Sequence, residues 1–191
     1  MNEPLGIDFD ARWKELCRLS RETDFKFASA SRTWEVLRFF AASKPGGHML
    51  EIGGGTGFST YWLLEGMSPS ARLISLEMID AYQSIARHIF EEDDRVIFEA
   101  ASMESLDQYE QGSFDLIFAD GEPGKYIHFE KAIDLLSSSG LYIIDDIMFR
   151  PHWNADHCKR VSKLVMSLYE RDDGYVTLIE QGDGVAVFLK R

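Results

Sequence analysis

Five short runs of apolar residues alternate along this chain with stretches of helical periodicity. Each run has five or six residues and is bounded by Gly, Pro, Asp or Ser: His48–Ile52, Arg72–Glu77, Val96–Ala100, Phe114–Ala119 and Leu141–Asp145. Strands that are apolar on both sides are typical of a parallel sheet with helices on both faces. The alternation therefore predicts right-handed strand–helix–strand crossovers and a doubly wound α/β sheet.

Helical patterns fill the segments between these runs. They are predicted at four places, Ser59–Gly66, Ala81–Glu91, Ser102–Tyr109 and Tyr126–Leu136. Three more helices are expected outside this core, at Phe9–Ser20, Ser31–Ala42 and Ala155–Arg171. Two strand-like segments, Tyr175–Glu180 and Gly184–Lys190, then flank Gly182-Asp183, a pair typical of a hairpin turn. We expect one domain, with N-terminal helices over 1–45 and a core over 46–191 whose seven-stranded, mostly parallel sheet ends in an antiparallel hairpin.

The composition argues against several classes of protein. Of the 191 residues, 45% are hydrophobic, which is typical of a folded protein and too many for a disordered one. Acidic side chains outnumber basic ones by 32 to 20, and the net charge of -12 disfavours nucleic acid as a partner. The apolar runs are too short to span a membrane, and the N-terminus lacks the pattern of a secretory signal. We expect a cytoplasmic protein with no nucleic-acid or membrane partner.

A glycine-rich turn joins the first predicted strand to the helix that follows it. It reads Glu51-Ile52-Gly53-Gly54-Gly55-Thr56-Gly57. Glycine allows a ligand to approach the backbone closely, and the N-terminus of a helix favours an anionic group. The dinucleotide fingerprint G-x-G-x-x-G fails, because Phe58 or Thr60 occupies its last position, and the phosphate loop of nucleotide hydrolases is absent. The turn predicts a nucleoside ligand with a charged group, and it argues against an NAD-linked oxidoreductase.

Glu77 lies twenty positions after Gly57, at the end of the second predicted strand. A carboxylate at this place can accept both hydrogen bonds of a ribose diol. The third strand leads into Ala101 and Ser102, where an adenine ring would fit, although Ser102 as a simple helix N-cap explains that position nearly as well. These residues extend the predicted nucleoside site along the edge of the sheet.

The order of these motifs resembles that of a class I S-adenosylmethionine-dependent methyltransferase, with a Rossmann-like fold, from about Ser31 to Arg191. Within that class, Phe114–Asp120 and Leu141–Asp146 resemble segments of small-molecule O-methyltransferases of the catechol and caffeoyl-CoA type. The segment Asp120–Tyr126 is similar to an uncharacterised bacterial branch of the same group. The resemblance implies that S-adenosylmethionine binds at these positions: Glu51, Gly53, Gly55, Gly57, Ser59, Glu77, Met78, Ala101, Ser102 and Asp120.

Three aspartates follow the fourth and fifth predicted strands. Because Asp120, Asp145 and Asp146 would meet at the carboxyl edge of the sheet, they are candidate ligands of Mg²⁺ or Ca²⁺. In the resembled enzymes an Asp and an Asp-Asn pair hold a metal that binds both hydroxyls of a catechol. Here Asp146 stands in place of the Asn. Pro123 stands in place of that group's lysine, and the nearest lysine is Lys125.

The group that removes the acceptor's proton is not settled by the sequence. Asp145, Asp146, His128 and His152 are candidates, and we take Asp120, Asp145, Asp146 and His152 as the catalytic set. Three readings of the carboxylates stay open: a metal site, a metal-free acid–base cluster with one raised pKa, or helix caps and surface charge. Trp153, in the loop after the fifth strand, is either a wall of the acceptor pocket or a packing anchor.

These features predict transfer of a methyl group from S-adenosylmethionine to a small-molecule acceptor, with a hydroxyl oxygen favoured. One alternative is an aminopropyltransferase of the polyamine-synthase type, although Thr56 stands where that family has an Asp. A second alternative is a non-catalytic module that binds the cofactor. The aromatic N-terminal helices are compatible with a homodimer interface.

Overall fold

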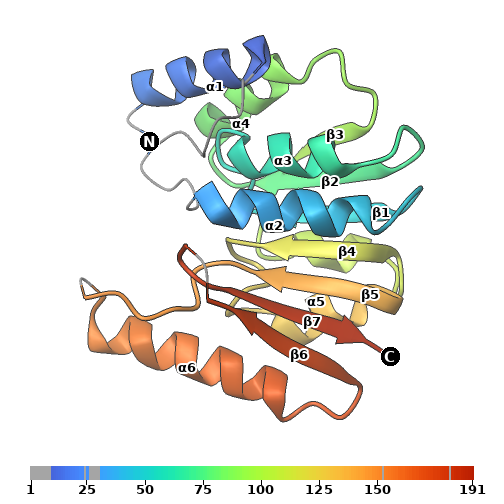
Figure 1. Cartoon of the computed structure of the whole chain (residues 1–191), viewed down its shortest axis with the longest axis vertical. Helices are drawn as coiled ribbons and strands as arrows, with labels where there is room; N and C mark the ends of the chain where they lie inside the picture. Colours follow the sequence, from blue (N-terminus) through green and yellow to red (C-terminus); the bar gives the residue numbers. More distant parts are fainter. Residues whose placement is uncertain (1–9, 24, 26–30, 152, 181) are drawn as a thin grey trace.

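Seven strands form one sheet in the part of the chain that the computed structural model describes, residues 10–23, 25, 31–151, 153–180 and 182–191. The strands are β1 (His48–Ile52), β2 (Arg72–Glu77), β3 (Val96–Ala100), β4 (Phe114–Ala119), β5 (Leu136–Ile144), β6 (Gly174–Ile179) and β7 (Val185–Lys190). Their order in the sheet is β3-β2-β1-β4-β5-β7-β6 (Figure 1). The first five strands pair in parallel, and β7 pairs antiparallel with both β5 and β6. The predicted mixed sheet with a C-terminal hairpin is confirmed.

The sheet order reverses between β1 and β4, which are neighbours although two strands separate them in sequence. The chain moves outward from β1 to β3 and then returns to the other side of β1. In open α/β sheets, ligands bind beyond the carboxyl ends of the strands at such a switch point. The topology therefore marks the ends of β1 and β4 as the place to look for a site.

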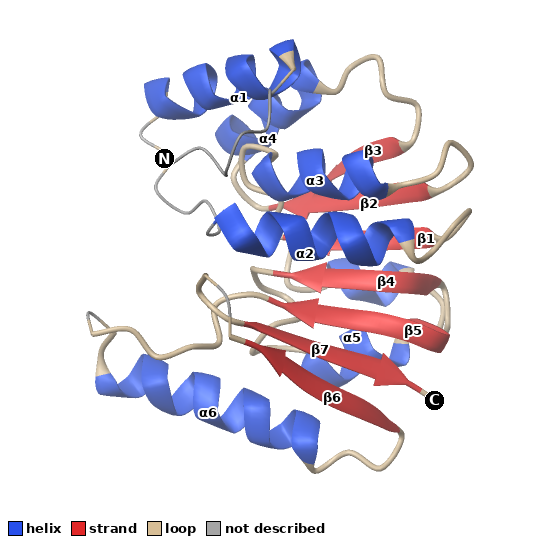
Figure 2. Cartoon of the chain, viewed as in Figure 1, coloured by secondary structure: helices blue, strands red, loops and turns tan. Residues whose placement is uncertain are grey.

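Helices cover both faces of the sheet (Figure 2). The helices are α1 (Ala11–Glu22), α2 (Ser31–Ala42), α3 (Phe58–Gly66), α4 (Asp80–Ile89), α5 (Phe129–Asp134) and α6 (Ala155–Tyr169). Successive strand residues alternate between two cores: Met49 packs with α1–α4 on one face, and Leu50 packs with α5 and α6 on the other. This is the packing expected of strands that are apolar on both sides.

An aromatic cluster attaches α1 to the rest of the molecule. Trp13 is 6% exposed, and its ring lies 5.0 Å from that of Trp34, 5.4 Å from Phe58 and 5.8 Å from Trp62. Trp34 on α2 therefore packs into the core, while Phe39 on the same helix is 70% exposed. No helix among the described residues is long and apolar enough to cross a membrane.

The structure corrects one predicted helix and shortens another. The predicted helix Ser102–Tyr109 is only a short 3-10 turn, Ser105–Gln108. Serine side chains compete for the backbone there, since Ser105 Oγ accepts the N–H of Ser102 at 2.7 Å. The predicted helix Tyr126–Leu136 begins only at Phe129, because His128 before it has a left-handed backbone with φ of 60°.

Candidate functional site

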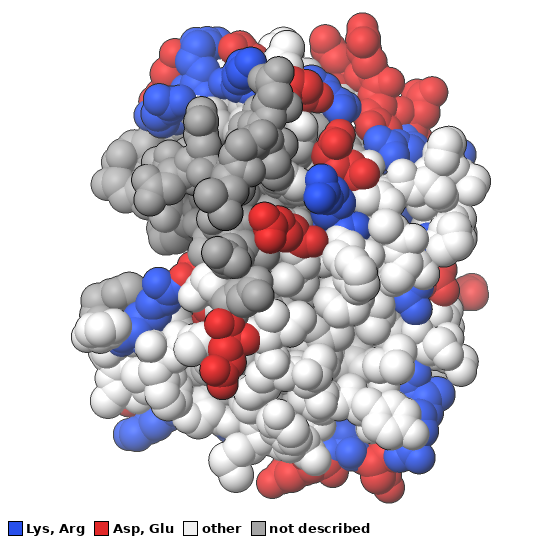
Figure 3. All heavy atoms as spheres, in the orientation of Figure 1, with Lys and Arg blue, Asp and Glu red and all other residues white. Residues whose placement is uncertain are grey.

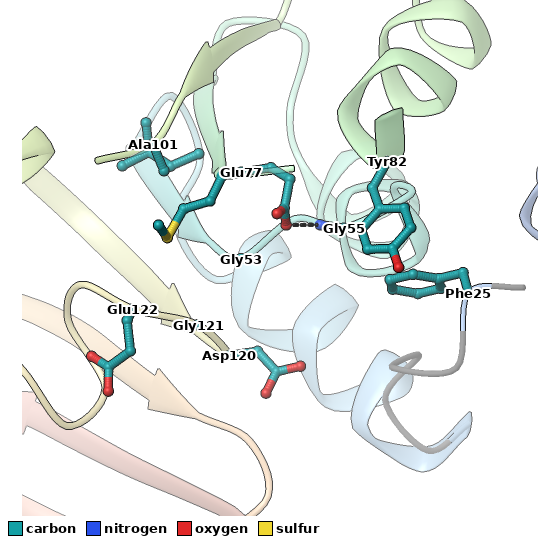
Figure 4. A pocket seen from close by; sticks show the side chains of 11 residues that line it. Phe25, Gly53, Gly55, Glu77, Tyr82, Ala101, Asp120, Gly121 and Glu122 are labelled. Carbon is teal, nitrogen blue, oxygen red and sulfur yellow. Dashed lines mark hydrogen bonds between the residues drawn. The ribbon is translucent and has the colours of Figure 1, made fainter. Parts of the chain in front are cut away.

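A cavity of about 230 Å³ opens beyond the carboxyl ends of β1, β2 and β4, at the switch point of the sheet. Figure 4 shows the side chains that surround it. Its lining residues come from five segments of the chain: Phe25, Gly53, Gly55, Leu76, Glu77, Met78, Tyr82, Ala101, Asp120, Gly121 and Glu122. Six of these positions were predicted for the cofactor, and the fold therefore brings them together around one cavity.

The glycine turn is packed too tightly for side chains. Gly53 has a φ of 88°, and a Cβ placed on it would lie 2.8 Å from the amide nitrogen of Gly121. The N–H groups of Gly53 and Gly54 both donate to the carbonyl of Leu76, at 2.8 and 3.1 Å. The turn thus ties the ends of β1, β2 and β4 together and exposes bare backbone to the cavity.

Glu77 connects two loops at the cavity wall. Its Oε2 accepts the N–H of Gly55 at 2.8 Å, and its Oε1 accepts the N–H of Ile79 at 2.8 Å. Figure 4 shows this carboxylate beside the glycine turn, with Asp120 on the other side of the cavity. The carboxylate is held in place by backbone groups, and its position beside the cavity fits a ligand hydroxyl pair.

Two aromatic residues form a part of the wall that the sequence did not predict. The Phe25 ring meets the Tyr82 ring edge to face at 4.9 Å, and Phe25 also packs against Gly55 (Figure 4). Phe25 lies between α1 and α2 in the sequence, so one residue from outside the α/β core contributes to the wall. For Phe25 the only sequence signal was an aromatic residue outside any predicted helix, whereas Tyr82 lies within the predicted helix Ala81–Glu91. Leu76, Gly121 and Glu122 were also missed, although each lies within two positions of a predicted residue.

Four residues predicted for the cofactor do not line this cavity. Glu51 is fully buried below the turn, where Thr60 Oγ1 donates to its carboxylate at 2.6 Å. Burial raises the pKa of Glu51, although hydrogen bonds from Ser59, Ser75 and Thr60 act in the opposite direction. The other three lie elsewhere: Gly57 is the N-cap of α3, Ser59 is buried within that helix, and Ser102 is exposed.

Asp120 is paired with a buried lysine. Lys125 Nζ lies 3.2 Å from Asp120 Oδ1, and their side chains are 6% and 19% exposed. Burial, together with the carboxylates of Asp145 and Asp146, raises the pKa of Asp120 to about 7 against the effect of Lys125. Burial lowers the pKa of Lys125 and the Asp120 carboxylate raises it, with a net rise. Asp120 therefore combines a location at the cavity with a pKa suited to proton transfer near neutrality.

The two aspartates after β5 are held differently. Asp145 is 1% exposed, and its Oδ1 accepts the hydroxyl of buried Thr33 at 3.0 Å. Asp146 has a left-handed backbone with φ of 61°. His152, the fourth predicted catalytic residue, lies outside the described residues, and His128 is an exposed residue before α5.

The metal hypothesis fits these contacts poorly. Within the described ranges, no three or more His, Cys, Asp or Glu side chains are arranged to hold a metal ion. One oxygen of Asp120 faces an ammonium group and one oxygen of Asp145 faces a hydroxyl donor, whereas a divalent cation would need such oxygens as ligands. We therefore derive no step through a metal.

A polar and aromatic chain of contacts links the cavity to the loop after β5. Glu122 pairs with Arg160 at 3.1 Å, and the Arg160 guanidinium lies 4.2 Å from the centre of the Tyr126 ring. The rings of Trp153 and His157 meet edge to face at 4.3 Å. Trp153 is partly buried against the α5–α6 core, so its packing role is observed.

Comparison with known proteins gives the same picture of the fold. The catechol O-methyltransferase of Mycobacterium tuberculosis is 27% identical over 128 residues, which are 64% of this chain and 58% of that protein. The chain thus spans little more than half the length of that relative. The O-methyltransferase from Bacillus cereus, solved in complex with SAH, superposes with a TM-score of 0.84 at 22% identity and covers 98% of this chain and 94% of its own.

A second solved structure is an O-methyltransferase from Streptomyces achromogenes involved in tomaymycin synthesis, in complex with SAM. Its TM-score is 0.83 at 21% identity, with 97% of this chain and 92% of that chain covered. The model of the O-methyltransferase family matches residues 35–191, which include the whole sheet and every lining residue of the cavity except Phe25. The chain belongs to the O-methyltransferase family.

Proposed function

We propose that this chain transfers a methyl group from S-adenosylmethionine to a hydroxyl oxygen of a small molecule. The observation that carries this proposal is the cavity at the switch point, with bare glycine backbone on one side, Glu77 beside it and Asp120 opposite. The bound SAH and SAM of the two solved relatives support it, because their chains share this fold nearly end to end.

The lining residues suit the parts of that cofactor. Glu77 presents carboxylate oxygens to the ribose hydroxyls, and Met78 and Ala101 provide an apolar surface for the adenine. Gly53 and Gly55 allow the amino-acid end to approach the backbone. Phe25 and Tyr82 line the cavity as an aromatic wall, and Phe25 packs beside Gly55.

The chemistry requires that the acceptor lose a proton. When bound, S-adenosylmethionine supplies a methyl group whose bond to sulfur breaks as the new bond to the acceptor oxygen forms. Asp120 is placed to take the hydroxyl proton, and its pKa of about 7 allows it to be ionised before transfer and protonated after it. Asp145, fixed by Thr33, and Asp146 add negative charge around this group. Orientation of the acceptor at the methyl group supplies the rest of the rate enhancement.

Methyl transfer to a panel of phenols, catechols, alcohols and amines, with S-adenosylmethionine as donor, tests the proposal. We expect turnover with hydroxyl acceptors, and Asp120→Asn should lower kcat by at least about 100-fold. Asp107→Asn, at an exposed carboxylate away from the cavity, is the matched control and should keep full activity. Transfer only from decarboxylated S-adenosylmethionine would instead identify an aminopropyltransferase. Cofactor binding with no turnover on any acceptor would identify a binding module.

We further propose that the acceptor is a small molecule rather than nucleic acid. The chain carries a net charge of -12, and on the face drawn in Figure 3 the Lys and Arg side chains lie among Asp and Glu side chains. Such a surface repels a phosphate backbone. A homodimer through α2, where Phe39 is exposed, is a further prediction that sedimentation equilibrium would check.

A further inference from the structure

Lys125 is a buried cation inside a carboxylate cluster. The residue is 5% exposed, and its Nζ contacts Asp120 Oδ1 at 3.2 Å and lies 5.6 Å from the centre of the Tyr126 ring. Lysine is almost never this buried without a charged partner, because removing an ammonium group from water costs several kcal/mol. The inward position of Lys125 therefore depends on the carboxylates around it.

The loop that carries Lys125 is fixed on both sides. The Glu122 carboxylate accepts the N–H groups of Tyr126 and Ile127 at 3.2 and 2.8 Å. The Tyr142 hydroxyl donates to the Gly124 carbonyl, and a Cβ on Gly124 would lie 2.7 Å from the side chain of Ile52. These contacts hold residue 125 toward the sheet, so its ammonium group is a built part of the site.

The carboxylates at this end of the sheet indicate the role of Lys125, which is to balance their negative charge. Asp145 and Asp146 act electrostatically on Asp120, and all three carboxylates act on Lys125. A divalent cation would require direct oxygen ligands at about 2.0–2.6 Å, and an ammonium group bonded to the same carboxylate opposes it both sterically and electrostatically. The Asp146 carboxylate, in place of the neutral amide of the resembled enzymes, adds a charge that Lys125 can balance.

We propose that the Lys125 ammonium group takes the place of a divalent cation at the acceptor end, so that methyl transfer here needs no metal and no vicinal diol. The inference rests on the proposed methyl transfer. Lys125 is a positioning residue, because it acts through Asp120. A metal that chelates two hydroxyls would select catechols, whereas a single carboxylate held by Lys125 needs only one hydroxyl to deprotonate. Acceptors with one hydroxyl are therefore expected to serve as well as catechols.

Titration with Mn²⁺, followed by its electron paramagnetic resonance signal, tests this directly in the full chain with SAH present. Wild-type protein should bind no stoichiometric Mn²⁺ up to about 1 mM, a threshold far weaker than a dedicated metal site. Lys125→Ala leaves three carboxylates without their cation and should gain Mn²⁺ binding. Lys131→Ala, at a surface lysine paired with Asp107, is the matched control and should bind no more than wild type. One Mn²⁺ per wild-type chain, lost in Asp120→Asn, would overturn the inference.

Activity provides a second, independent test. Turnover should be unchanged by EDTA, and kcat/KM for a monophenol should lie within about fivefold of that for the matching catechol, a difference of roughly 1 kcal/mol. Lys125→Arg should retain more activity than Lys125→Ala, because it keeps the charge. Loss of turnover in EDTA would refute the inference while leaving the methyl transfer itself established. If SAH does not bind, the proposed function fails first, and the wild-type Mn²⁺ titration still decides whether a metal site exists.

Discussion

At the scale of single residues, the Glu77 carboxylate has two roles. It holds the N–H groups of Gly55 and Ile79, and it faces the cavity. Glu77→Ala should therefore weaken SAH binding at least about tenfold, or about 1.4 kcal/mol, as measured by calorimetry. Glu110→Ala, at an exposed glutamate, should stay within twofold of wild type. Equal affinities for all three proteins would remove Glu77 from the site.

Because the pKa of Asp120 is raised in the folded chain, the free energy of unfolding should depend on pH. Its folded pKa of about 7 lies above the ordinary value of 3.8, so the folded chain keeps a proton that the unfolded chain has lost. The stabilising effect is present below about pH 4 and is lost as the pH rises to about 7. Over this range, the free energy of unfolding should fall more steeply with pH in wild type than in Asp120→Asn, by about 1 kcal/mol per pH unit. Urea unfolding at several pH values measures both slopes, and parallel slopes would contradict the assignment.

Single residues of the site were predictable only where they follow a strand or belong to the glycine turn. Gly53, Glu77 and Asp120 satisfy this condition, because topology alone places strand ends together. Phe25 and Tyr82 do not, since the contact between their rings is a tertiary contact between residues 57 positions apart, which no local pattern predicts. Lys125 was noted as the nearest lysine, but its inward direction depends on the backbone course of the preceding loop.

At the scale of elements, we expect the glycine turn between β1 and α3 to be highly sensitive to substitution. Gly53→Ala should lower the free energy of unfolding by about 2–4 kcal/mol, because a left-handed backbone and a collision with the Gly121 backbone add together. Gly112 has a φ of 74° but no atom within 4 Å of its Cβ position. Gly112→Ala should therefore show the backbone cost alone, about 1–2 kcal/mol. Equal losses of unfolding free energy in the two variants, measured by urea unfolding, would mean that contact with the Gly121 backbone does not constrain the turn.

The bounds of helices and strands were predicted well where a hydrophobic run defines the element. They were predicted poorly where side chains compete with the backbone for hydrogen bonds. The first four strands begin and end as predicted, since each is a buried run bounded by turn residues. The fifth begins at Leu136, five residues early, because Leu136 already pairs with Phe114 of β4, and a register shift then separates this pair from the pairing that resumes at Leu141. The missing helix at 102–109 reflects local serine hydrogen bonds that periodicity does not register.

At the scale of the whole molecule, the aromatic cluster packs α1 against α2 and α3, and we predict that the N-terminal helices unfold together with the core. Trp13→Ala should lower the free energy of unfolding by about 3–5 kcal/mol, since it removes a buried indole from four ring contacts. We expect fluorescence and circular dichroism to follow one transition in wild type, as for a single domain. Two separated transitions would show that residues 1–45 fold independently of the core.

The central claim is that the cavity at the switch point holds S-adenosylmethionine, and a calorimetric titration with SAH tests it most directly. The product lacks the reactive methyl group, so binding is measured without turnover or an acceptor. We predict that one SAH binds per chain with a dissociation constant of about 1 μM, which corresponds to a binding free energy of about -8 kcal/mol. EDTA should leave this affinity unchanged. A chain that unfolds cooperatively, and is therefore folded, but gives no heat of binding with millimolar SAH would contradict this claim.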